Sequence, residues 1–185
     1  MVHNNDLGHL VDLIGALRSN KNKNCFGATV YEDPMLSNDD HRKYQVIARP
    51  DEDRYELTCR EGSRQLSMTY HPGRQLLIRQ DPGEAQVRVE GHDLFPAAPP
   101  VLAMFSPLDL PIWGGDRDGQ RVVAVMSEAA GMIRLNFTPK DAPDYLDGGG
   151  YAIIDLSKCV VTELHYLGRR YRAKNITSYY PLEFS

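Results

Sequence analysis

The sequence contains few cysteines, and no two of them lie close together. Cys25, Cys59 and Cys159 form no Cys-x-x-Cys pair, so a redox motif or a local zinc site has no support, and at most one intramolecular disulfide can form. The six histidines are equally scattered and form no His-x-x-x-His or His-Glu-x-x-His unit. We therefore expect no metal site and no cofactor.

Motifs for covalent and phosphate chemistry are also missing. The chain has no Gly-x-Ser-x-Gly nucleophile turn. Gly148-Gly149-Gly150 precedes an expected strand instead of a helix and lacks a following lysine, so it favours a flexible loop over a phosphate-binding loop. Asp39-Asp40-His41 has acid–base side chains, but a polar loop beside a histidine is common. We expect no catalytic residue, and the protein is not expected to be an enzyme.

Long apolar runs and a basic excess are absent as well. No apolar run approaches the ~20 residues that span a bilayer, so we expect no membrane span. Acidic residues number 25 and basic residues 21, which argues against nucleic acid as a partner because phosphate binding needs a concentrated basic surface. The basic cluster Arg169-Arg170-Tyr171-Arg172 with Lys174 fits a solvated strand face.

The N-terminus, from Met1 to Asp6, shows no basic region followed by an apolar run. We therefore expect a cytoplasmic protein, or a periplasmic or envelope-associated one if a signal segment was removed from this chain.

Hydrophobic periodicity predicts one helix followed by many strands. Residues 6–18 carry apolar side chains at i, i+3, i+4 and i+7, with Asp6 as a candidate N-cap. Over residues 25–90 the period becomes two, and short turns force neighbouring strands to pair antiparallel in a meander. A second run of strands is expected over residues 121–180. The expected turns are Asp51-Glu52-Asp53, Glu61-Gly62-Ser63, His71-Pro72-Gly73 and Asp81-Pro82-Gly83. We expect Gly62 and Gly73 to provide the positive φ that a tight turn can require.

Residues 91–120 interrupt the alternation with a lid segment and a loop. Leu94 to Trp113 is apolar and rich in proline, so it can hold only short helical turns, of which Val101 to Phe105 after Pro99-Pro100 is the best candidate. The predicted architecture is a single α+β domain over residues 1–185, mainly β. One highly curved antiparallel sheet, a half-barrel, is covered by the N-terminal helix and by the proline-rich helical lid, because a long sheet coils and its apolar concave face needs a cover.

The motifs of the meander resemble those of a known family. Arg49-Pro50 ends one strand, Arg54-Tyr55 begins the next, Gly62 marks a turn, and Tyr70-His71-Pro72 closes a later strand before Gln75. This order resembles the outer-membrane lipoprotein carriers, the LolA/LolB-like family, in which an Arg-Pro strand end is followed by an Arg-Trp or Arg-Tyr strand, an Asp-Gly turn and a Tyr-x-Pro strand end. Glu61-Gly62 stands here for the Asp-Gly turn, and no tryptophan lies in the strand Leu66 to Tyr70.

The resemblance implies a non-catalytic binding or carrier protein with a hydrophobic pocket between the sheet and the lid. The ligand would be a lipid or a lipidated protein. The arginine of the family's Arg-Pro strand end bonds lid carbonyls and holds the empty pocket closed, and Arg49 matches that arginine. The residues expected to line the pocket are Leu57, Met68, Tyr70, Ile78, Leu94, Phe95, Leu102, Met104, Phe105 and Trp113.

Two other hypotheses remain open from the sequence. The same fold can serve as an envelope regulatory or protein-interaction module, with an envelope protein as partner and a pocket filled by its own side chains. Alternatively, the strands can form a cytosolic calycin-like barrel that holds a small cofactor.

Overall fold

The alternating segments of the sequence form the strands of one sheet. The computed structural model describes residues 4–19, 25–34, 41–61, 64–81, 83–90, 98–114, 118–141 and 149–179. Its helices are α1 (Asn4–Ser19) and α2 (Pro100–Ala103), with the short 3-10 turns η1 (Pro50–Glu52), η2 (Pro72–Arg74) and η3 (Pro107–Asp109). The strands are β1 (Cys25–Pro34), β2 (Arg42–Arg49), β3 (Arg54–Glu61), β4 (Arg64–His71), β5 (Leu76–Gln80), β6 (Val87–Glu90), β7 (Gln120–Ala129), β8 (Met132–Pro139), β9 (Gly150–Asp155), β10 (Val160–Tyr166) and β11 (Arg169–Tyr179).

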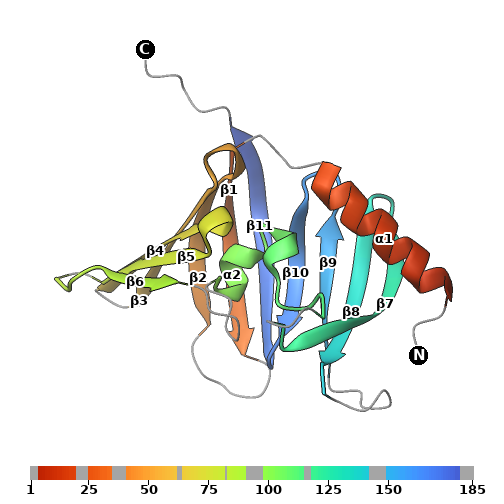
Figure 1. The fold of residues 1–185 in the computed structure, drawn as a ribbon. Coiled ribbons are helices and arrows are strands. Elements are labelled where there is room, and N and C mark those ends of the chain that lie inside the picture. The colour runs from red at the N-terminus through yellow and green to blue at the C-terminus, as the bar shows by residue number, and fades with distance from the viewer. Residues whose placement is uncertain are drawn as a thin grey trace.

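The sheet has 11 antiparallel strands in the order β6-β5-β4-β3-β2-β1-β11-β10-β9-β8-β7. The predicted meander β1–β6 and the second run β7–β11 are therefore joined where the first and last strands of the chain pair, from Cys25 opposite Tyr179 to Pro34 opposite Arg169. The sheet is curved and open, with β6 and β7 at its two edges (Figure 1). This confirms the half-barrel and shows that the calycin-like barrel hypothesis was wrong.

Alternation sets which side chains face the core. In β2, Tyr44, Val46 and Ala48 are buried while their neighbours in sequence are exposed. Val46 lies opposite Leu57, and Leu57 lies opposite Met68, so apolar side chains continue across β2, β3 and β4 on one face. The register of each strand pair follows from this alternation, because a shift of one residue would move every apolar side chain of a strand to the opposite face of the sheet.

Two covers lie over the concave face. The lid, defined as residues 98–114, contains α2 and η3 and lies in front of the middle of the sheet, whereas α1 crosses the strands near β7 (Figure 1). Pro100 begins α2, where the missing N–H of proline costs no hydrogen bond. The buried lid residues are Ala98, Val101, Leu102, Ala103, Met104, Phe105, Pro107, Leu110, Pro111 and Ile112.

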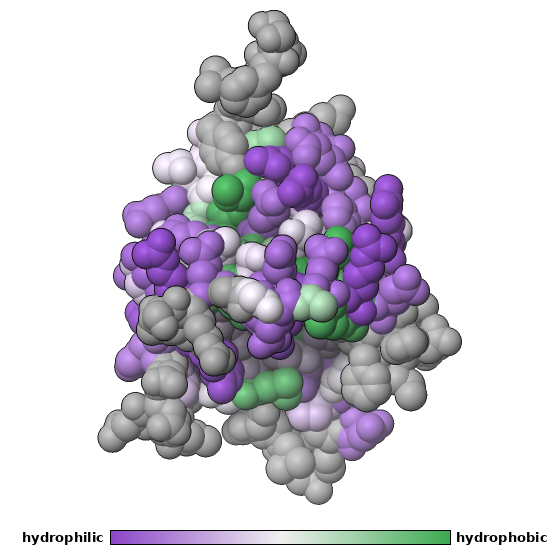
Figure 2. Space-filling model, turned by 90° about the vertical axis from the view of Figure 1, so that its left-hand side faces the viewer, coloured by the Kyte–Doolittle hydropathy of each residue, from purple (hydrophilic) through white to green (hydrophobic). Residues whose placement is uncertain are grey.

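Polar residues cover most of the surface seen from the side of β3–β6, and hydrophobic residues are visible there only in separate patches (Figure 2). The basic cluster of β11 lies in the sheet as predicted, and its arginines are paired with acids: Arg169 with Glu32, Arg170 with Glu163, and Arg172 with Asp33. No described helix is long and apolar enough to cross a membrane.

Candidate ligand-binding site

Two proline-initiated turns lie side by side at one end of the sheet. Each begins with a proline, Pro50 in η1 and Pro72 in η2, whose carbonyl oxygen accepts a hydrogen bond from the residue after the turn. Those residues, Asp53 (φ 51°) and Gln75 (φ 48°), adopt the left-handed conformation that non-glycine residues rarely take. The motifs Arg49-Pro50 and His71-Pro72 thus build the same turn twice.

The two turns are linked through Asp53. Both oxygens of its carboxylate accept the N–H of Gly73 at 2.9 Å, and its carbonyl oxygen bonds His71 Nδ1 at 3.0 Å. A Cβ at position 73 would lie 2.8 Å from Asp53 Oδ2, which explains the glycine. The expected reason was a positive φ at Gly73; the structure corrects this, because Gln75 takes the left-handed conformation instead. Gly62 lies outside the described residues.

Hydrogen bonds fasten the lid to the sheet. The N–H of Val161 in β10 donates to the carbonyl oxygen of Met104 at 2.7 Å, and Gln75 Nε2 reaches Asp109 Oδ1 at 3.4 Å. The hydroxyl of Ser106 donates to the Asp109 carboxylate and also shares a hydrogen bond with the Tyr55 hydroxyl in β3. These contacts form a polar connection between the lid and strands β3 and β4.

The acidic side chains at this connection change the ionisation of nearby tyrosines. Burial, together with the carboxylates of Asp109 and Asp53, raises the pKa of Tyr55 to about 12. Burial and the same two carboxylates also raise the pKa of Tyr70, whose hydroxyl accepts a hydrogen bond from Gln75 Nε2 at 3.1 Å. Both tyrosines are therefore neutral hydrogen-bonding groups at physiological pH.

A cavity of about 580 Å³, which we call the turn cavity, opens between these two turns and the lid. Its walls come from α1, both turns, β3, the lid and the β9–β10 turn, so segments distant in sequence meet there. Its lining residues are Leu17, Pro50, Asp51, Asp53, Tyr55, Pro72, Gly73, Phe105, Ser106, Pro107, Leu108, Asp109 and Cys159.

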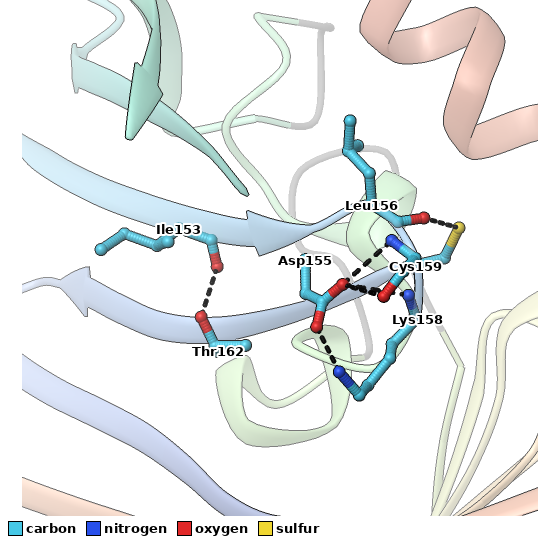
Figure 3. Close-up of polar contacts among 7 residues, drawn as sticks. Ile153, Asp155, Leu156, Lys158, Cys159 and Thr162 are labelled. Carbon is cyan, nitrogen blue, oxygen red and sulfur yellow. Dashed lines mark hydrogen bonds and ion pairs between the residues drawn. The ribbon is translucent and has the colours of Figure 1, made fainter. Parts of the chain in front are cut away.

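The β9–β10 turn holds Cys159 at the cavity wall (Figure 3). Asp155 Oδ1 accepts hydrogen bonds from the backbone N–H groups of Ser157 and Lys158 at 2.9 and 3.2 Å and from the Ser157 hydroxyl at 2.6 Å, while Oδ2 bonds Lys158 Nζ. Cys159 Sγ lies 3.5 Å from the Leu156 carbonyl oxygen. Burial and the nearby Asp155 raise the pKa of this thiol, which keeps it protonated and poorly nucleophilic.

Two further cavities lie against the sheet. The arginine cavity, about 330 Å³, is lined by Glu32, Arg42, Tyr44, Leu57, Leu66, Met68, Pro99, Pro100, Val101, Arg169 and Tyr171. The helix cavity, about 440 Å³, is lined by His9, Asp12, Leu13, Ala16, Val125, Met126, Ser127, Ala129, Gly131, Met132, Ile133 and Leu156. The described residues contain no group of three or more histidines, cysteines or acidic residues placed to hold a metal ion.

The structure divides the residues expected to line one pocket. Phe105 lines the turn cavity, and Leu57 and Met68 line the arginine cavity. Tyr70, Leu102 and Met104 are fully buried in the hydrophobic core and line neither cavity. Trp113 is half-buried and donates its Nε1–H to the Pro107 carbonyl at 3.0 Å, Ile78 is half-buried in β5, and Leu94 and Phe95 lie outside the described residues.

Arg49 lies at the base of η1. Its guanidinium Nη1 is 3.4 Å from Glu56 Oε2 and 4.0 Å from Glu52 Oε2, and its side chain is 30% exposed. Among the described residues it forms no hydrogen bond with a lid carbonyl, so the bond implied by the family resemblance stays a prediction. The polar contacts that join the lid to the sheet and its turns instead include those of Met104, Ser106 and Asp109 with Val161 and Gln75.

Sequence reasoning did not identify most residues of the turn cavity. Asp51, Asp53 and Pro72 were expected only as turn residues, and Ser106 to Asp109 only as part of the lid. The sequence did contain a signal for these turns, because proline fixes φ at the first position of a turn. Pro50 and Pro72 each stand three residues before the residue that follows the turn, Asp53 or Gln75. Recognising both prolines as one repeated turn would have placed them at the same end of the sheet.

Comparisons of the whole structure identify the fold. An uncharacterized conserved protein from Thermus thermophilus is 8% identical, with a TM-score of 0.53 over 95% of this chain and 90% of that chain. A chain in the structure of the Pseudomonas aeruginosa MucA/MucB complex is 20% identical, with a TM-score of 0.50 over 93% of this chain and 58% of that chain. The fold is LolA-like.

A LolA superfamily protein from Nitrosomonas europaea is also similar, at 11% identity and a TM-score of 0.39 over 90% of this chain and 92% of that chain. The chain described here spans 61% of the length of the MucB chain in the crystal structure of MucB alone. No protein-family model and no curated protein matches the sequence. At these identities the likeness concerns the fold, so ligand and partner have to be inferred from this chain's own residues.

Proposed function

We propose that this LolA-like protein is a non-catalytic binding or carrier protein that holds an alkyl chain of a lipid or lipidated protein in the turn cavity. The observation that carries the proposal is the cavity of about 580 Å³ beneath the lid. Its volume lies within the roughly 300–1,000 Å³ typical of small-molecule sites.

The chemistry of the cavity wall favours an apolar ligand. Leu17, Phe105 and Leu108 contribute side chains from α1 and the lid, and the three prolines of the wall add apolar rings without N–H donors. Each methylene transferred from water to such a wall gains about 0.8 kcal/mol, so an alkyl chain of several methylenes provides enough free energy for stable binding.

The lid gives the site a means of opening. The connection through Ser106, Asp109 and Gln75 consists of a few hydrogen bonds, each worth about 1 kcal/mol net. We propose that ligand entry breaks this connection. We further propose that Arg49 assists closure by holding η1, whose Pro50 lines the cavity, through its ion pairs with Glu56 and Glu52. The site of action we propose is the bacterial envelope.

One observation favours a second candidate function, a protein-interaction module. Tyr70, Leu102 and Met104 fill the space between sheet and lid, so the centre of the concave face is closed by its own side chains. A protein of the same fold, MucB, has been solved in complex with MucA. In this alternative the lid and turns contact a protein partner and the turn cavity stays empty.

Native mass spectrometry and dye binding distinguish the two functions. We expect co-purified lipid, and a lipophilic dye that increases in emission on binding and is displaced by an alkyl ligand. Leu108→Trp, which fills the turn cavity, should abolish dye binding, whereas Leu167→Trp at a residue that is 73% exposed should not. Absence of dye binding to the correctly folded wild-type protein, or equal binding by both variants, would reject the proposed site.

A further inference from the structure

We propose that the turn cavity selects amphiphiles whose polar end carries an ammonium group. This inference rests on the proposed function, because it assigns a ligand class to the same cavity. The site is the cavity itself, and its charged wall residues decide which head group can enter.

Among the described residues, the charged side chains that line the turn cavity are all acidic. Asp51, Asp53 and Asp109 belong to the wall, and no described lysine, arginine or histidine does. The other two cavities differ: the arginine cavity has Arg42 and Arg169 together with Glu32, and the helix cavity has one aspartate and one histidine. The negative character is therefore specific to the cavity beneath the two turns.

The described arginines nearest to Asp51 and Asp53 in the sequence form ion pairs with other acidic residues. Arg49 is paired with Glu52 and Glu56, and Arg54 is also paired with Glu56. Neither Asp51 nor Asp53 forms an ion pair with a described residue: Cys25 Sγ lies 3.8 Å from Asp51 Oδ1, and the Asp53 carboxylate accepts a backbone N–H. Both partners are neutral, so the hydrogen bonds orient the carboxylates without cancelling their charge.

The negative electrostatic potential of these carboxylates also affects the pKa of neighbouring ionisable groups. Burial and then Asp51 raise the pKa of the Cys25 thiol, and Arg49 offsets this only in part. Burial and then carboxylates of the wall raise the pKa of Tyr55 and Tyr70. A negative potential that disfavours thiolate and tyrosinate also disfavours a fatty-acid carboxylate or a phosphate at this position. An ammonium group is stabilised there, while its alkyl chain contacts the prolines, Phe105 and Leu108.

Three probes of equal chain length test the inference: dodecylamine, dodecanol and dodecanoate, each below its critical micelle concentration, in competition with a neutral lipophilic dye. The amine is protonated at neutral pH because its pKa resembles the roughly 10.4 of lysine. We expect the amine to bind more tightly than the alcohol, and the alcohol more tightly than the acid. Ethylamine, which has the charge but almost no chain, should not displace the dye.

Asp51→Asn removes one charge from an exposed residue that makes no ion pair with a described residue. It should weaken amine binding by roughly three- to tenfold and strengthen dodecanoate binding, since a unit charge at the wall acts over several ångströms in a partly shielded site. The matched control Glu84→Gln removes the same charge from an exposed residue of the β5–β6 connection and should change neither affinity. Equal binding of all three long-chain probes, tighter binding of dodecanoate, or an unaltered preference in Asp51→Asn would overturn the head-group selection and leave the alkyl-chain site standing. Failure of every probe to bind the folded protein would overturn both.

Discussion

The hydrogen bond between Tyr55 and Ser106 provides a direct measure of how strongly the lid is held to the sheet. Tyr55 lies in β3 and is 6% exposed, while Ser106 belongs to the lid and also donates to Asp109. Tyr55→Phe removes the hydroxyl together with its need for a partner, so we expect a loss of about 1 kcal/mol in the free energy of unfolding. Ser106→Ala leaves the Tyr55 hydroxyl buried without this partner and removes a donor from Asp109, so we expect a loss of about 2 kcal/mol.

The double variant isolates the contact between the two residues. Once Tyr55 lacks its hydroxyl, Ser106→Ala loses only the bond to Asp109. The loss of stability in the double variant should therefore be smaller than the sum of the two single losses by about 1 kcal/mol. Urea unfolding at neutral pH gives the four stabilities, and hydrogen exchange should accelerate in residues 100–113 of Ser106→Ala before it does in β3 and β4. Ser67→Ala is a suitable control because the Ser67 hydroxyl is at an exposed contact, 3.4 Å from the Gln80 carbonyl oxygen. Losses that add within ~0.3 kcal/mol would show that Tyr55 and Ser106 do not hold the lid.

Three other predictions follow from particular contacts. Gly73→Ala should cost about 1–2 kcal/mol in thermal unfolding because the new Cβ would meet Asp53 Oδ2 at 2.8 Å, and the cost should shrink in an Asp53→Ala background; an equal cost in both backgrounds would contradict this. Burial acts to raise the pKa of Asp155, but hydrogen bonds from Lys158 and Ser157 lower it more, so that it lies below the ordinary 3.8. The ionised Asp155 carboxylate therefore contributes to stability above pH 3.8, and this contribution is lost as the pH falls through the lower pKa of the folded state. Asp155→Asn should reduce stability at neutral pH and flatten the acid limb of a stability–pH curve, and an unaltered acid limb would refute the assignment. Arg49→Leu, which breaks partly exposed ion pairs, should lower global stability by less than about 1 kcal/mol; faster exchange in the lid with slow exchange in β3 and β4 would support its proposed role in closure, and uniform exchange would remove it.

The sequence was sufficient for the architecture because the relevant signals are local. Alternation in segments such as Arg42–Arg49 and Arg54–Glu61 arises because each strand has one buried face, and short turns require neighbouring strands to pair antiparallel. The helix at the N-terminus and the proline-initiated turn at Pro100 were predicted by the same kind of local pattern. The pairing of β1 with β11 depends on contacts between chain ends, which no local pattern encodes.

The cavities could not be predicted in the same way, because apolarity does not distinguish a core from a pocket. Met104 and Phe105 are adjacent lid residues of similar character, yet Met104 is buried between sheet and lid while Phe105 reaches the turn cavity. The difference arises from the direction of each side chain in a short turn. A polar residue such as Asp109 was also invisible as a site residue, because only the folded chain brings it near Tyr55 and Tyr70.

The separation of closed core and open cavity along one sheet has a functional consequence. Met104 is fixed to β10 through its carbonyl oxygen and to the core through its side chain, and Leu110 and Ile112 return the lid to the core. Between them, Ser106 and Asp109 contribute polar side-chain contacts. The cost of moving the lid is therefore expected to rise away from the Ser106–Asp109 segment, toward Met104 on one side and toward Leu110 on the other. An alkyl chain that enters beneath η3 would break the hydrogen bonds of Ser106 and Asp109. One that advanced to Leu102 would also have to displace core side chains, whose burial contributes about 1.5–3 kcal/mol each. A chain bound as we propose would therefore stay at the turn-facing end of the sheet, next to the aspartates that we propose select its head group.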